Sequence, residues 1–77
     1  MKWIAEIMSP KKIRAEIKKE RVLDVVNNEY LDWYYLYIFE NGAEVPQWDY
    51  VQEDFDVTVE QANEQFGVPL NAWRQVA

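Results

Sequence analysis

The chain has 77 residues, contains no cysteine and no histidine, and carries a formal net charge of −6. This composition excludes disulfides, thiolate metal sites and every mechanism that needs an imidazole as general base, zinc ligand or pH switch. A chain of this length forms a single domain, residues 1–77, that buries only about 60–65% of its unfolded surface. Its four Trp, five Tyr and three Phe residues must therefore supply much of the core.

The charges are divided unevenly along the sequence. Residues 1–21 contain seven bases and three acids, a local sum of +4, whereas residues 22–77 contain eleven acids and one base, a local sum of −10. Such a division predicts either an electrostatic partner or attraction between the two parts of the chain, and a solvated surface is the simplest alternative.

The first residues do not resemble a targeting segment. Met1–Met8 carries charges among its apolar residues and leads directly into Ser9-Pro10, unlike a secretory signal. No apolar stretch approaches the ~20 residues of a membrane-spanning helix. We therefore expect a cytoplasmic protein with no membrane partner.

The segments before residue 22 differ in how clearly they indicate a structure. Alternation of Trp3, Ala5 and Ile7 favours a strand over residues 2–8. Residues 9–21 fit two structures. Ser9-Pro10 could cap and begin a helix, whereas apolar residues at 13, 15 and 17 alternate with charged residues as in a strand. Helix and strand both stay open here.

The longest apolar run lies in the middle of the chain. Trp33–Phe39 consists of seven aromatic or branched aliphatic residues, a composition typical of a strand. Val22–Val26 is rich in β-branched residues and precedes the turn-forming pair Asn27-Asn28, which predicts another strand. Because both faces of the Trp33–Phe39 run are apolar, we expect it to lie inside the sheet.

Asn41-Gly42, just after this run, predicts a tight hairpin over residues 33–50. A two-residue type I′ turn needs positive φ at both central positions, which Asn and Gly tolerate. Such a turn fixes the register and sets Ile38 opposite Val45. The register places seven residues on one face of the hairpin: Trp33, Tyr35, Tyr37, Phe39, Pro46, Trp48 and Tyr50.

A helix is predicted over residues 59–66. Thr58 with Gln61 three residues later resembles a capping box, and Gly67 suits the position just after a helix. The predicted fold is therefore α+β, with a small antiparallel sheet of three or four strands around the central Asn-Gly hairpin. The C-terminal helix packs on one face of that sheet.

Motifs of catalysis and metal binding are absent from the sequence. It contains no nucleophile elbow, phosphate-binding loop or metal-ligand spacing. The sequence has one serine and one threonine, Ser9 and Thr58. Their hydroxyl groups are better explained as helix caps than as catalytic nucleophiles. We predict a protein that is not an enzyme and uses no cofactor and no metal.

Four acids lie at the end of the hairpin or just after it: Asp49, Glu53, Asp54 and Asp56. Their spacing does not match a calcium-binding EF-hand loop, which also needs a central glycine. Three interpretations stay open: a solvated loop that caps the helix, a contact for a basic partner, and a site for a specific cation.

The aromatic face of the hairpin has two interpretations. It is core if the helix covers it, with Trp73 seated against the body of the domain. Otherwise the helix covers the aliphatic face, with Leu36 and Ile38, and part of the aromatic face stays exposed. Tyr and Trp clusters are typical of interface hot spots. Single-stranded nucleic acid also stacks on strand aromatics, but the local charge of −10 opposes phosphate.

The favoured function is a small non-enzymatic protein-binding or regulatory module, such as an inhibitor or immunity-type protein, that meets a basic protein partner. Two alternatives are a self-associating homodimer and a small-molecule or peptide pocket between the aromatic face and Trp73. The predicted partner-binding residues combine the aromatic and acidic groups: Trp33, Tyr35, Tyr37, Trp48, Tyr50, Glu53, Asp54 and Asp56.

Overall fold

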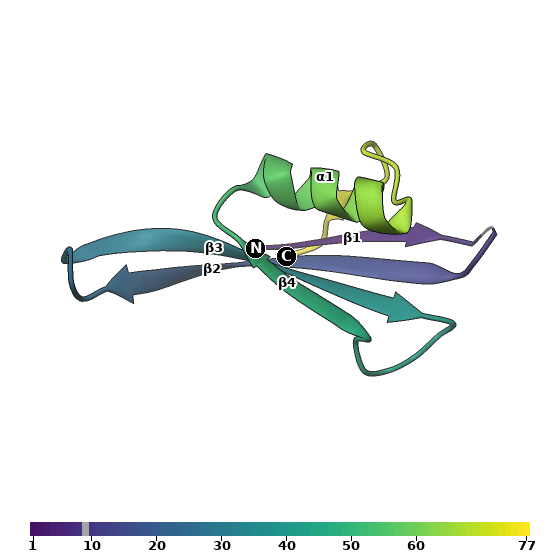
Figure 1. The fold of residues 1–77 in the computed structure, drawn as a ribbon, viewed down its shortest axis with the longest axis horizontal. Coiled ribbons are helices and arrows are strands. Elements are labelled where there is room, and N and C mark those ends of the chain that lie inside the picture. Colours follow the sequence, from purple (N-terminus) through teal and green to yellow (C-terminus); the bar gives the residue numbers. More distant parts are fainter. Residues whose placement is uncertain (9) are drawn as a thin grey trace.

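The computed structural model describes residues 1–8 and 10–77, and within them it shows one antiparallel sheet covered on one side by one helix (Figure 1). The fold is α+β, as predicted. The sheet has five strands in the order β4-β3-β2-β1-β5, rather than three or four. The elements in chain order are β1 (Lys2–Ile7), β2 (Ile13–Asp24), β3 (Glu29–Glu40), β4 (Trp48–Gln52), α1 (Phe55–Phe66) and β5 (Arg74–Gln75).

The segment that the sequence left open is a strand. Residues 13, 15 and 17 of β2 are buried beneath α1, while their neighbours point to the other side of the sheet. A helix would have buried only Ile13 and Ile17, whereas a strand also buries Ala15, so tertiary burial decides the structure. The proposed Ser9 cap lies outside the described residues.

A long hairpin joins β2 to β3. Ile13 lies opposite Glu40 at one end and Asp24 opposite Glu29 at the other. The predicted strand over residues 22–26 ends earlier than expected, at Asp24. Its carboxylate accepts hydrogen bonds from the N–H groups of Val26 and Asn27 and from the Asn27 side chain, which closes the turn.

The connection from β3 to β4 differs from the predicted two-residue hairpin. Asn41 and Gly42 have φ of 54° and 75°, and the Ala43 N–H donates to the Glu40 carbonyl at 3.1 Å. The chain does not return as a strand after this turn. The β4 ladder begins at Trp48, opposite Ile38, which is a shift of three residues from the predicted partner. An odd shift turns every β4 side chain to the other face.

Side-chain chemistry explains this shift. In a two-residue hairpin the Glu40 N–H bonds to the carbonyl of residue 43, but here it donates to Oε1 of Gln47 at 2.6 Å. The Gln47 N–H in turn donates to the Ile38 carbonyl at 2.9 Å, so pairing resumes there. Residues 44–46 are left outside the ladder.

The helix begins one turn before the predicted start. Asp54 is the N-cap, and its carboxylate accepts from the Val57 N–H at 3.2 Å. Thr58, predicted as the cap, is inside the helix and fully buried, with Oγ1 donating to the Asp54 carbonyl. The predicted end is confirmed, because Gly67 has φ of 72° and Val68 closes the cap by donating to the Ala62 carbonyl.

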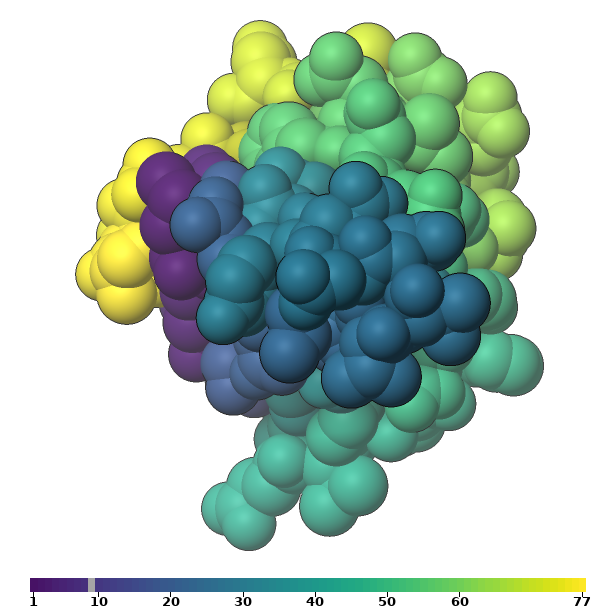
Figure 2. Space-filling view, turned by 90° about the vertical axis from the view of Figure 1, so that its left-hand side faces the viewer, coloured from purple at the N-terminus to yellow at the C-terminus, as the bar shows by residue number. Residues whose placement is uncertain are grey.

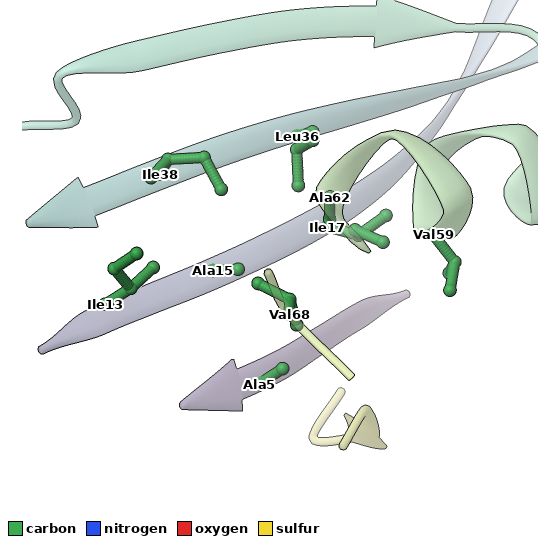
Figure 3. Close-up of a cluster of buried hydrophobic side chains, with 9 residues drawn as sticks. All are labelled: Ala5, Ile13, Ala15, Ile17, Leu36, Ile38, Val59, Ala62 and Val68. Carbon is green, nitrogen blue, oxygen red and sulfur yellow. The ribbon is translucent and has the colours of Figure 1, made fainter. Parts of the chain in front are cut away.

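The core lies between α1 and the aliphatic face of the sheet (Figure 3). Of the two interpretations of the hairpin, the helix therefore covers the Leu36 face. Alanines on the sheet and on the helix let α1 approach closely. The core consists of Ala5, Ile13, Ala15, Ile17, Leu36, Ile38, Val59, Ala62 and Val68.

The β2–β3 hairpin extends beyond the rest of the sheet. β1 stops opposite Lys18 and β4 stops opposite Tyr34, so residues 20–33 continue as a two-stranded ribbon, which we call the arm. It reaches past the helix in Figure 1 and faces the viewer in Figure 2. Val25 and Val26 at its tip are 78% and 88% exposed. The arm gives the molecule its length of 45 Å against widths of 24 and 22 Å.

Candidate functional site

The predicted site residues on β3 lie on the face of the sheet opposite α1, which we call the open face. Trp33, Tyr35 and Tyr37 point to this side in a single column that continues to Phe39. No element of the described residues covers the open face (Figure 1). Flanking side chains shield the three predicted residues only in part and leave them half-buried, whereas Phe39 is buried.

Charged side chains of β2 and β1 stand beside this column. The Glu16 carboxylate forms ion pairs with the side-chain nitrogens of two cations, Lys2 and Arg14, each at an N···O distance of 3.0 Å. Lys18 pairs with Glu20 at 3.0 Å, and a hydrogen bond to that carboxylate raises the pKa of Lys18. The Arg14 guanidinium also stacks 4.1 Å from the centre of the Phe39 ring, an electrostatically favourable contact.

Trp48 and Tyr50, the other two predicted aromatics, lie on the helix side. Their rings are 6.3 and 6.1 Å from that of Phe66, and they close the core along the β4 edge. Trp48 is still 49% exposed, and its indole N–H donates to Glu40 at 3.3 Å. The structure therefore does not bring these two rings together with the column on the open face.

The predicted acids of residues 53–56, here called the acidic junction, connect β4 to α1. Glu53 and Asp54 separate two shallow hollows of about 460 and 400 Å³. The smaller hollow also includes Trp33, so the structure brings this aromatic residue close to the predicted acids. The larger hollow is lined by Tyr30, Leu31, Asp32, Tyr34, Glu53, Asp54, Phe55 and Asp56.

Sequence reasoning missed the aromatic cluster beside the larger hollow. The Phe55 ring lies 4.6 Å from Trp3 and 5.8 Å from Tyr34. Tyr34 shares the period-two spacing of Leu36 and Ile38, a signal that assigns it to the helix side. Trp73 also packs on the helix side and lines a separate hollow of about 320 Å³, away from the open face.

Most bases of residues 1–21 form ion pairs inside the chain. Lys19 and Arg21 both contact Asp32, at 3.5 and 3.3 Å. Burial raises the pKa of Asp32, but the bond from Arg21 and the charge of Lys19 outweigh it and lower the pKa overall. Lys11 pairs with Glu40 and lowers the pKa of that carboxyl group. Three of the six ion pairs of the described residues join residues 1–21 to Asp32 or Glu40, so attraction within the chain accounts for only a part of the charge division.

The acids of β4 and α1 have no such compensation. The sequence has no Lys or Arg between Glu44 and Glu64, and none of the carboxylates there forms an ion pair within residues 1–8 and 10–77. There are seven of them: Glu44, Asp49, Glu53, Asp54, Asp56, Glu60 and Glu64.

Three of these acids lie on or directly after an open sheet edge: Asp49, Glu53 and Asp54. β4 is the outermost strand on its side, so alternate N–H and C=O groups of its backbone point away from β3 without a strand partner. Trp48 and Val51 on this strand are 49% and 44% exposed. We call β4 together with the acidic junction the acidic edge.

Side chains that could bind a metal ion do not converge in the described part of the chain. No group of three or more carboxylates there is arranged to hold a metal ion. No helix among the described residues is long and apolar enough to cross a membrane.

Comparison of the chain with protein-family models, with curated proteins and with solved structures finds no match.

Proposed function

We propose that this protein is a non-enzymatic protein-binding module that takes a basic, extended segment of a partner at the acidic edge. The observation that carries the proposal is the combination of the outermost strand β4 with seven carboxylates that form no ion pair within residues 1–8 and 10–77. The same charge opposes phosphate backbones, so a protein is a better partner than a nucleic acid. A cytoplasmic location is part of the proposal.

The edge strand supplies affinity without a deep pocket. An extended segment can add itself to β4 through backbone hydrogen bonds, and its alternate side chains then meet the two faces of the sheet. On the helix side they meet Trp48 and Tyr50, and on the open face they meet Asp49 and Val51, with Tyr35 one strand further in. The predicted aromatic residues thus contribute from both faces, although they do not form one surface.

The acidic junction supplies selectivity for bases. Lys and Arg side chains are attracted by carboxylates and by the faces of aromatic rings. Both hollows offer the two together, with Glu53 shared between them, Trp33 on one side and Phe55 on the other. Charge of one sign around the edge also accelerates association with a basic partner and makes it sensitive to salt.

The experiment uses a ten-residue peptide of alternating lysine and valine, titrated into ¹⁵N-labelled protein, beside the same peptide with glutamate in place of lysine. We expect the lysine peptide to shift the amide signals of β4 and residues 53–57, and its affinity to fall between 50 and 500 mM salt. Equal binding of the two peptides would contradict the proposal.

A matched pair of variants locates the site. Glu53→Gln with Asp56→Asn removes two junction charges and leaves the Asp54 cap in place, whereas Glu6→Gln with Glu29→Gln removes two charges elsewhere. We expect the junction variant to bind the lysine peptide about tenfold more weakly, equivalent to about 1.4 kcal/mol. The control variant should bind nearly as the unchanged protein does, and equal losses in both would mean that only net charge matters.

A further inference from the structure

We infer that Asn41 is a site of spontaneous deamidation, at which its side-chain amide is replaced by a carboxylate through a cyclic intermediate with Gly42. The only co-reactant is water. The inference is independent of the binding proposed for the acidic edge, because it concerns the turn after β3 and changes the covalent structure of the chain.

The reaction joins atoms of two neighbouring residues. The backbone nitrogen of Gly42 loses its proton to the solvent and attacks Cγ of Asn41. The new N–Cγ bond closes a succinimide ring, and the bond from Cγ to Nδ2 breaks, so that Nδ2 takes a proton from the solvent and leaves as ammonia. Water then opens the ring. Attack at Cγ gives aspartate, and attack at the backbone carbonyl carbon of residue 41 gives isoaspartate, in which the chain continues through the former side chain.

Both reacting groups are free within the part of the chain that the structure describes. The Asn41 side chain and the Gly42 N–H take part in none of the hydrogen bonds there. Both residues are exposed, so water reaches them. Glycine has no Cβ that could hinder the approach of its nitrogen to Cγ of the preceding residue. Asn41 therefore meets the steric and the hydrogen-bonding conditions of the reaction together.

Two of the other four asparagines have a side-chain amide that is already engaged. Nδ2 of Asn27 donates to the Asp24 carboxylate at 2.8 Å. Nδ2 of Asn63 donates to the Val68 carbonyl at 3.0 Å, and Asn63 also lies inside α1, where the helix fixes the backbone. Attack on either amide would first have to break these bonds.

The remaining two asparagines precede a less reactive nitrogen. Asn28 is followed by Glu29, which begins β3 and carries a side chain. Asn71 is followed by Ala72, whose N–H donates to the Pro69 carbonyl at 3.1 Å. The structure thus separates Asn41 from all other asparagines of the chain, whose positions are 27, 28, 63 and 71.

The connection after β3 permits the backbone rotation that ring closure requires. Two backbone hydrogen bonds hold the turn, from the Asn41 N–H to the Lys12 carbonyl at 3.0 Å and from the Ala43 N–H to the Glu40 carbonyl at 3.1 Å. Residues 44–46 lie outside the ladder, and Val45 is 72% exposed. An exposed segment with so few bonds opens locally at a small cost in free energy.

A nearby cation also favours the attack. The Lys12 ammonium group lies beside the turn, where it would be 3.8 Å from a Cβ at Gly42. A positive charge there stabilises the negative charge that develops at the Gly42 nitrogen and at the attacked carbonyl oxygen. The Glu40 carboxylate, whose charge would oppose this, is paired with Lys11.

The two products differ in what they do to the turn. Aspartate adds a negative charge and keeps the backbone as it is. Isoaspartate adds the same charge and also lengthens the backbone by one atom, inside the turn that the bond from Ala43 to Glu40 closes. This turn lies at the start of the connection that sets the register of β4.

The test keeps the folded protein at 37 °C and pH 8 for four weeks and measures the masses of the intact chain and of its proteolytic fragments. Electron-transfer fragmentation distinguishes isoaspartate from aspartate. We expect the chain to gain one mass unit at Asn41, with isoaspartate among the products. Conversion there should be about tenfold faster than at any other asparagine, a difference of about 1.4 kcal/mol in activation free energy.

A matched pair of variants assigns the site. Asn41→Gln and Asn28→Gln both place glutamine at a positive φ, 54° and 53°, so the backbone strain is similar. The longer side chain of glutamine closes a ring much more slowly. We expect Asn41→Gln to gain almost no mass in four weeks, and Asn28→Gln to gain it as fast as the unchanged protein. An unmodified Asn41 after four weeks, or faster conversion at another asparagine, would overturn the inference. Mapping of the unchanged protein decides this even if Asn41→Gln does not fold.

Discussion

Gly67 ends α1 at a backbone geometry that few other residues adopt without cost. Its φ of 72° is left-handed, and a Cβ there would meet no atom within 4 Å. The cost of Gly67→Ala is therefore purely conformational, and we expect the free energy of unfolding to fall by about 1–2 kcal/mol in urea titrations. D-alanine at the same position suits positive φ and is the matched control. An equal loss with D-alanine would show that the backbone geometry is not the cause.

Carboxylates whose pKa is lowered in the folded state make the free energy of unfolding depend on pH. Hydrogen bonds from Asn27 lower the pKa of Asp24 below 3.8, and Lys11 lowers that of Glu40 below 4.5. A group whose pKa is lower in the folded state stabilises the fold above its unfolded pKa, and this stability is lost as pH falls through the folded value. We expect the free energy of unfolding to decrease on acidification below about pH 4.5. Glu40→Gln should decrease less, and identical pH profiles would contradict the assignment.

The two faces of β3 should respond differently to truncation. Leu36 is fully buried under α1, so Leu36→Ala should lower the free energy of unfolding by about 2–5 kcal/mol. Tyr37, on the open face of the same strand and only half-buried, should cost clearly less when it is changed to Ala. Urea unfolding at low micromolar concentration compares them. Equal costs would mean that the open face is also core.

The cap of α1 offers a second element-scale test. Asp54→Ala removes the acceptor for the Val57 N–H and should lower the free energy of unfolding by about 1 kcal/mol. Thr58→Val keeps the volume of the buried side chain and removes only its bond to the Asp54 carbonyl. If Thr58→Val lowered the helix signal in circular dichroism and Asp54→Ala did not, Thr58 would be the cap, as the sequence predicted.

Local chemistry predicted element ends better than it predicted pairing. Gly67 predicts a helix end because glycine adopts positive φ at little cost. Asn41-Gly42 predicts a turn because Asn and Gly both tolerate positive φ. The β4 register depends instead on Gln47, which reaches back to Glu40 across the connection, and no local pattern reveals that bond. For the site, period-two spacing placed Trp33 and Tyr35 on one face, but the shifted register moved Trp48 to the other.

The shape of the whole molecule comes from its arm. The radius of gyration is 13.3 Å, against about 11.5 Å for a compact chain of this length. Replacing residues 21–32 by Asn-Gly would join Glu20 and Trp33, which already face each other. We expect this chain to fold with a melting temperature within about 5 °C of the original. Small-angle scattering should show the radius of gyration fall toward the compact value, and an unfolded product would mean that the arm supports the core.

The strand order also determines how the sheet can assemble. From β1 to β4 every neighbour in the sheet is the next strand in the chain, so three hairpins can close one after another over short loops. The pairing of β5 with β1 is different, because it joins residues as far apart in the sequence as Trp3 and Gln75. The helix α1 lies between these two strands in the sequence, so we expect it to dock before they pair. Rapid folding is typical of such local topologies. We expect the outer edge of β1 to close last during folding and to exchange its amide protons first in the native state.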